Sequence, residues 1–133
     1  LEVNYLLQRL EAFDGVVILT TNFATSIDEA FIRRLRFRVT FVLPDADHRA
    51  KLWESMLPPE LPVSEDLFFK ELGDVFELTG GHIRNTVLRA AMLAADADEP
   101  LGQKLAWTAA AAEYHELGKL APPYPEDDEE EDW

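Results

Sequence analysis

The spacing of hydrophobic positions changes near residue 44. Before it, apolar residues at helical spacing over 2–13 predict an amphipathic helix. The apolar run 16–20 and the β-branched and aromatic run 37–43 predict two strands, the first of them central in a parallel sheet. Ser26, followed three residues later by a glutamate, predicts a capped short helix between these strands.

Beyond residue 44 the spacing is helical throughout, and four helices are predicted. The first runs to about Met56 and is capped by Asp45 or Asp47, and the second is short and capped by Ser64. The third follows Thr79, and the fourth begins at residues 98–100 and includes an alanine-rich stretch through Tyr114. The predicted fold is therefore α/β, with parallel strands and helices, followed by an all-α region of about four helices.

These patterns divide the chain into three parts. Residues 1–44 are expected to belong to an α/β core, residues 45–120 to a helical domain, and residues 121–133 to a disordered acidic tail. The chain begins inside a helical pattern without an initiator methionine, so we expect it to be an excerpt of a longer protein.

Composition narrows the classes of partner. The formal net charge is -14, and half of it comes from the seven consecutive carboxylates of residues 126–132. This acidity argues against nucleic acids and anionic membranes as partners, because both need clustered lysine and arginine. The sequence has no cysteine, which excludes disulfides and cysteine metal sites and favours a cytoplasmic protein. No apolar stretch approaches the roughly 18 residues of a membrane span, so none is expected.

Three polar groups are candidates for chemistry. Asn22 follows the first predicted strand, at the sheet edge where α/β proteins bind ligands, although an asparagine there can also only cap a turn. Arg33, Arg34, Arg36 and Arg38 make up the basic cluster of the chain. The alternative is a solvated helix end, where cations favour the C-terminal dipole.

The third group is the segment that precedes the third predicted helix of the helical region. Gly80 and Gly81 would let a planar group approach the backbone, and the helix start offers unpaired N–H groups. A glycine-rich turn is the alternative. His82 either touches a ligand or is simply exposed, and Arg84 either binds a ligand or pairs with a carboxylate.

Taken together, these motifs resemble the AAA ATPase family. The resemblance covers residues 1 to about 115 and consists of LLQ, VILTTN, IDEAF and RRLRF in that order, followed by the change from sheet to helices. It implies the C-terminal half of a P-loop AAA module: the end of the α/β core and the helical lid. Related bacterial proteins with the LLQRLE and TTN pattern resemble ATPases encoded with phage-tail-like contractile assemblies.

The resemblance implies roles for individual residues. Asn22 would be the sensor-one residue near the γ-phosphate, and Arg36 the arginine finger that reaches a neighbouring subunit's nucleotide, with Arg38 as a second finger. Gly80 and Gly81 would meet adenine and ribose, and Arg84 would occupy the sensor-two position. The sequence departs from the usual pattern here, because it is two residues shorter after the finger region and has leucine in place of the common glycine.

Two family motifs do not occur in the sequence. There is no GxxxxGK[ST] loop and no apolar strand ending in adjacent acids, so ATP and Mg²⁺ would be bound mainly by a missing N-terminal half. The three histidines match no metal-ligand spacing, and no metal site is expected within the chain itself.

These implications define the expected function. The parent would be an ATPase, forming a homo-oligomeric ring, hexameric by resemblance, that couples ATP hydrolysis to remodelling or assembly of a protein partner. The chain alone would be inactive. The alternative is a non-catalytic, AAA-derived interaction or assembly scaffold.

Overall fold

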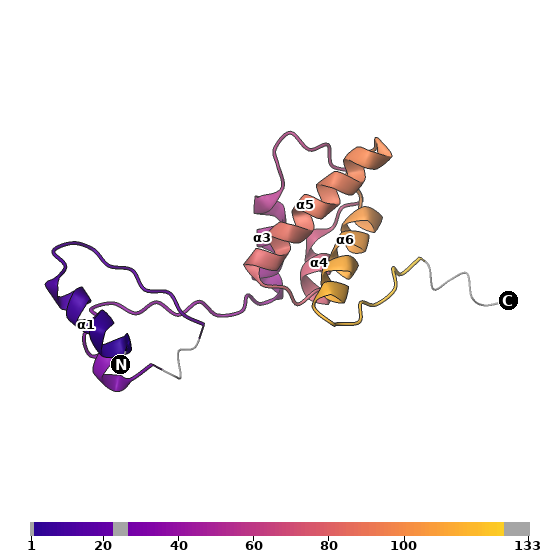
Figure 1. The fold of residues 1–133 in the computed structure, drawn as a ribbon. Helices are drawn as coiled ribbons and strands as arrows, with labels where there is room; N and C mark the ends of the chain where they lie inside the picture. Colours follow the sequence, from indigo (N-terminus) through magenta and orange to yellow (C-terminus); the bar gives the residue numbers. More distant parts are fainter. Residues whose placement is uncertain (1, 23–26, 127–133) are drawn as a thin grey trace. The chain divides into compact units, whose positions relative to one another are not determined.

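The computed structural model describes residues 2–22 and 27–126, and Figure 1 shows its ribbon. The chain divides into two compact units, Leu1–Phe41 and Val42–Trp133. The described residues form helices and no strand: α1 (Glu2–Ala12), α2 (Glu29–Ile32), α3 (Ala46–Met56), α4 (Phe69–Val75), α5 (Gly80–Ala97) and α6 (Gln103–Glu116). None of these helices is both long enough and apolar enough to cross a membrane.

The α/β core expected from the sequence is wrong for this structure. Residues 16–20 and 37–43 are extended but pair with no strand in the described part of the chain. Val16 and Ile18 are 88% and 82% exposed, and Phe41 is 94% exposed, whereas a central parallel strand would be buried on both faces. Apolar and β-branched composition gives a preference for strands, but a strand forms only when a neighbour satisfies its backbone hydrogen bonds.

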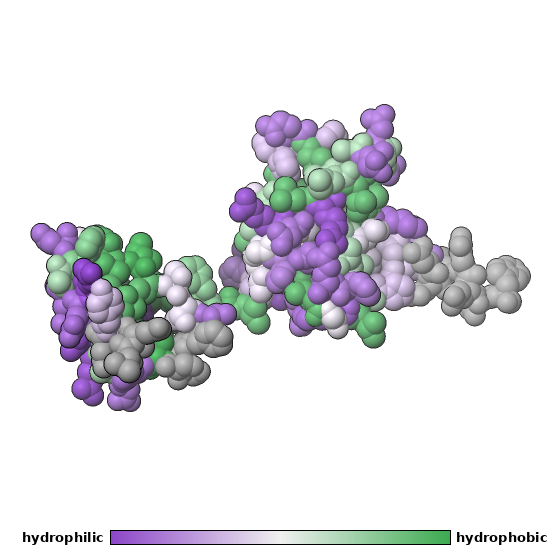
Figure 2. Space-filling model, viewed as in Figure 1, coloured by the Kyte–Doolittle hydropathy of each residue, from purple (hydrophilic) through white to green (hydrophobic). Residues whose placement is uncertain are grey.

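In the first unit the two helices contain the buried residues Leu7 and Phe31. The ion pair between Nη1 of Arg34 and Oε1 of Glu11, 2.6 Å apart, links the segment after α2 to α1. Because both side chains are about half exposed, this pair adds little stability. Figure 2 shows hydrophobic side chains open to solvent on this unit.

The helix α2 begins differently from the prediction. Asp28 is its cap, because Oδ1 of Asp28 accepts a hydrogen bond from the backbone N–H of Ala30 at 3.0 Å. The predicted cap, Ser26, lies outside the described residues, as do residues 127–133 of the predicted tail. The expected disorder therefore stays a prediction for residues 127–133. Within the described part of the predicted tail, Nε1 of Trp107 donates a hydrogen bond to the carbonyl of Pro122 at 3.1 Å, and the rings of Trp107 and Tyr124 lie 5.6 Å apart.

The second unit is built around an aromatic core between its helices. Helix α5 packs against α6 and α3, and α3 packs against α4 (Figure 1). Phe76, which follows α4, contacts the rings of Trp107 and Tyr114 on α6 edge to face, with centroids 5.0 and 5.2 Å apart. Trp53 on α3 is 1% exposed and completes this core. The core fixes the start of α5 beside α3 and the end of α6.

Two helix starts differ from the sequence prediction. Ser64 caps no helix; it lies in a turn, and α4 begins only at Phe69. The reason is a side chain from a distant segment: Oε1 of Gln103 accepts a hydrogen bond from the N–H of Phe68 at 2.9 Å. Helix α6 in turn begins at Gln103 rather than at residue 98, because Leu101 pairs through its backbone with residues 62–64.

Candidate ligand cleft at the start of helix α5

The start of α5 is capped as the sequence predicts. Oγ1 of Thr79 accepts a hydrogen bond from the N–H of His82 at 3.3 Å. Gly80 and Gly81 form the first helical turn. A Cβ on Gly80 would meet only Cδ1 of Leu52, at 3.9 Å, and a Cβ on Gly81 only Oγ1 of Thr79, also at 3.9 Å. Neither glycine is therefore required by the packing of the unit.

A cleft of about 450 Å³ lies beside this turn. Its lining comes from the segment before α3, from α3, from the start of α5 and from the segment after α6: Leu43, Pro44, Arg49, Glu77, Leu78, Thr79, His82, Leu117 and Lys119. Four of these residues are apolar and five are polar or charged. The volume falls within the roughly 300–1,000 Å³ of sites for small molecules.

Two cations that line the cleft are held by the protein. The guanidinium of Arg49 donates from Nε to the carbonyl of Gly73 at 2.8 Å and from Nη1 to the carbonyl of Pro44 at 2.7 Å. The Nζ of Lys119 lies 5.1 Å from the ring centroid of Tyr114, a cation–π contact. Arg49 is therefore fixed in the lining of the cleft by backbone carbonyls, whereas Lys119 is held there by the ring of Tyr114.

A buried carboxylate lies behind the cleft. Glu113 on α6 is 3% exposed, and its Oε1 is 2.7 Å from Nδ1 of His82. Its Oε2 is 3.9 Å from Nη2 of Arg89, which also binds Oε1 of Glu116 at 2.6 Å. His82, whose side chain is 36% exposed, thus connects the buried carboxylate to the cleft. Sequence reasoning did not find Glu113, because its partner is 31 residues away.

None of the three predicted nucleotide-binding residues, Gly80, Gly81 and Arg84, lines the cleft itself, although the two glycines lie between the lining residues Thr79 and His82. Arg84 lies on α5 and is exposed. It does not line the cleft, and it forms no ion pair within residues 2–22 and 27–126. The alternative that it pairs with a carboxylate therefore finds no support among the described residues.

The predicted catalytic residues lie in the first unit. Asn22, Arg36 and Arg38 are all exposed, and Asn22 follows an extended segment rather than the edge of a sheet. Arg36 and Arg38 lie beyond α2 and have no ion-pair partner in the described part of the chain, unlike Arg34. The three residues therefore remain predictions, separate from the group at the start of α5.

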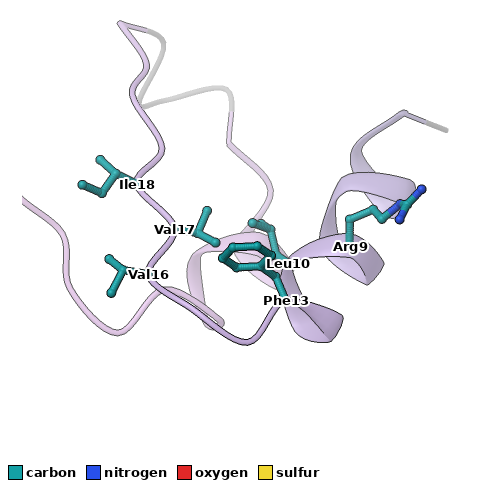
Figure 3. A pocket seen from close by; sticks show the side chains of 6 residues that line it. All are labelled: Arg9, Leu10, Phe13, Val16, Val17 and Ile18. Carbon is teal, nitrogen blue, oxygen red and sulfur yellow. The ribbon is translucent and has the colours of Figure 1, made fainter.

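The first unit has a hollow of its own, of about 370 Å³. Figure 3 shows the side chains that line it, which come from the end of α1 and the extended segment that follows. Leu10, Phe13 and Val17 lie close together there, whereas Arg9 projects away from them. An open apolar hollow without convergent polar groups offers no orientation to a ligand, so we do not assign it a binding role.

Within the described residues, no group of three or more histidine, aspartate or glutamate side chains could hold a metal ion. The carboxylate of Asp45, at the start of α3, has a lowered pKa because it accepts a hydrogen bond from the backbone N–H of His48, and also bonds the ring of His48. It caps a helix and does not line the cleft.

Comparison with known proteins gives one informative match. No protein-family model matches the chain. Over 80 residues, or 59% of its length, the chain is 35% identical to the katanin p60 ATPase-containing subunit A1 of Strongylocentrotus purpuratus. The match covers 15% of that relative, so the chain corresponds to a small part of it. The relative is an animal protein, and the bacterial setting suggested by the sequence gains no support. At a coarse level, this similarity supports an AAA ATPase-like region in the chain.

Proposed function

We propose that this chain is part of an AAA ATPase and that its helical unit binds the adenosine end of a nucleotide in the cleft beside α5. The parent protein would couple ATP binding and hydrolysis to remodelling or assembly of a protein partner. It would act as a homo-oligomeric ring, hexameric by family resemblance. The similarity to an ATPase-containing subunit supports the ATPase relation at a coarse level.

The observation that carries this proposal is the pair of glycines that lies in the chain between Thr79 and His82, two residues that line the cleft. Glycine is a poor helix former, and the unit's own packing requires neither Gly80 nor Gly81 in the first turn of α5. A planar ligand lying against this turn would supply a reason for both. The apolar walls from Leu43, Leu78 and Leu117 suit the faces of a purine.

We assign the base and the ribose of ATP to this chain, but not its phosphates. The cleft offers walls and polar groups for a base and a ribose. The sequence has no GxxxxGK[ST] loop for the phosphates, and the described residues contain no acidic cluster for Mg²⁺. We therefore assign Mg²⁺ and the phosphates to other parts of the parent, and we expect this chain alone not to hydrolyse ATP.

We assign catalytic roles in the parent protein to three residues of the first unit. Asn22, an uncharged donor and acceptor, would position the attacking water near the γ-phosphate of its own subunit. Arg36 and Arg38 would reach the nucleotide of a neighbouring subunit, where a planar guanidinium stabilises the spread charge of a transferring phosphoryl group. Their exposure leaves both guanidinium groups accessible to a neighbour.

A nucleotide titration tests the proposal. The full 133-residue chain, labelled with ¹⁵N, is titrated with ADP, and amide shifts are recorded. We expect the largest shifts at Gly80, Gly81 and Leu117, and little change at Met92, which is exposed on α5 away from the cleft. Phosphate release with ATP and Mg²⁺ should stay at the buffer level. Absence of any shift at millimolar ADP would exclude the cleft as a nucleotide site.

The scaffold function remains the second candidate. It is favoured by the exposed apolar segments of the first unit, since large exposed apolar patches mark surfaces that bind other proteins. It predicts association with a protein partner that is indifferent to ADP. Nucleotide-dependent association would favour the ATPase proposal.

A further inference from the structure

The pair formed by His82 and Glu113 joins the interior of the helical unit to its cleft. His82 lines the cleft, whereas Glu113 does not. Nδ1 of the imidazole lies 2.7 Å from the carboxylate, so this edge of the ring faces the protein interior. The opposite edge, which carries Nε2, is left for the cleft. The hydrogen bond to Glu113 therefore orients the ring of His82, although Glu113 itself does not line the cleft.

The carboxylate also selects the tautomer of the ring. The guanidinium of Arg89 lies 3.9 Å from Oε2 of Glu113. A carboxylate can only accept hydrogen bonds, so Nδ1 of His82 is the donor in this contact. In a neutral imidazole whose proton is on Nδ1, Nε2 bears a lone pair and is an acceptor. The cleft therefore presents a hydrogen-bond acceptor at this point.

We infer that Glu113 is a positioning residue that makes Nε2 of His82 an acceptor selective for a 6-aminopurine over a 6-oxopurine. This inference rests on the nucleotide function proposed above. The 6-amino group of adenine is a donor, which can satisfy Nε2. A 6-oxo group presents lone pairs in the same place, and two acceptors that face each other in a cleft leave both unsatisfied.

Other charged groups line the same cleft or lie beside the carboxylate and could compete with this effect. They are Arg89 and Glu116, paired on α5 and α6; Arg49 on α3; Glu77 before α5; and Lys119 after α6. Arg49 is bound to two backbone carbonyls, and Lys119 contacts the ring of Tyr114. Because Glu113 is the charged group in hydrogen-bond contact with His82, we assign the tautomer to it.

The test compares ADP with IDP, whose bases differ at position 6 and at the adjacent N1, an acceptor in adenine and an N–H donor in hypoxanthine. Long-range ¹H–¹⁵N spectra of the full chain first establish the tautomer and the titration midpoint of His82. On the alkaline side of that midpoint we expect the Nδ1–H tautomer and roughly three- to tenfold tighter binding of ADP, the value of one neutral hydrogen bond. On the acid side, Nε2 becomes a donor, and the preference for ADP should disappear.

Two variants separate positioning from packing. Glu113→Gln keeps the size of the side chain but frees the tautomer, and His82→Phe keeps a ring but removes the acceptor. Both should bind ADP and IDP with similar affinity, whereas Met92→Ala should keep the wild-type preference. Far-UV circular dichroism verifies folding. If Glu113→Gln fails to fold, His82→Phe and the pH dependence of the wild type still decide the inference.

The outcomes distinguish this inference from the function on which it rests. If neither nucleotide binds the wild type, both the proposed function and the inference are wrong. If ADP and IDP bind equally, or if the preference persists in His82→Phe, only the inference fails. A shift of the His82 resonances by pyrophosphate as large as that by ADP would also overturn it, because the histidine would then be recognising phosphate.

Discussion

The contact between α3 and α4 provides a sharp test of the packing. Gly73 is buried within α4, and a Cβ added there would lie 2.5 Å from the carbonyl oxygen of Ala46 and 2.8 Å from the backbone nitrogen of Ala50. Both are backbone atoms, so no side-chain rotation relieves the overlap. The Gly73→Ala variant can fold only if α4 moves away from α3.

The magnitude follows from two opposing contributions. In an exposed helix, alanine in place of glycine would stabilise by about 1 kcal/mol. Here overpacking costs about 1–3 kcal/mol, and separating the helices also strains the hydrogen bond from Arg49 to the carbonyl of Gly73, which is worth about 1.5–3 kcal/mol. We expect a net loss of about 2 kcal/mol, or a fall in melting temperature of roughly 8–16 °C for a unit of this size.

Thermal and urea unfolding of the full chain, followed by near-ultraviolet circular dichroism of its aromatic core, measures this loss. The matched control is Gly81→Ala, since a Cβ on Gly81 makes only an ordinary contact at 3.9 Å. The control should be as stable as the wild type or slightly more stable. The packing described for α3 and α4 would be refuted if Gly73→Ala matched the wild type or exceeded it.

Two further predictions concern helix caps. Thr79→Ala should lower the free energy of unfolding, measured by urea unfolding, by about 1 kcal/mol, because the N–H of His82 loses its acceptor. Thr79→Ser keeps a hydroxyl acceptor and should therefore be nearly as stable as the wild type. Folding lowers the pKa of the Asp45 carboxyl group. Its contribution to stability is therefore present above its pKa in the unfolded chain and is lost as the pH falls through its pKa in the folded chain. Melting temperatures from about pH 6 to pH 2 should therefore fall less steeply for Asp45→Asn than for the wild type. Parallel curves would count against this capping role.

Local chemistry allowed several features to be predicted correctly. Thr79 precedes and caps α5, as expected, and Asp45, one of the two aspartates expected to cap α3, is its cap in the structure. A cap needs only a side-chain oxygen within three residues of the N–H from which it accepts. The start of α4 could not be predicted in this way. It depends on Gln103, which reaches Phe68 across 35 positions of the chain, and no local pattern records such a contact.

The candidate site shows the same division. The glycines at the start of α5 are evident in the sequence as a break in helical preference. Glu113 instead lies in a run of alanines, and its burial and its bond to His82 exist only once α5 and α6 pack together. A lone acid on an otherwise small, apolar helix face is the signal that could have found it.

The sequence by itself determined the helical spacing beyond residue 44, the capped start of α5 and the acidic charge, because these depend on neighbouring residues and on composition. The tertiary structure decided what became of the apolar segments. Residues 16–20 and 37–43 have the composition of strands, yet they are exposed and pair with no strand among the residues that the structure describes. A helix satisfies its backbone within one segment, but a strand depends on a neighbour, and only the three-dimensional arrangement shows whether one is present.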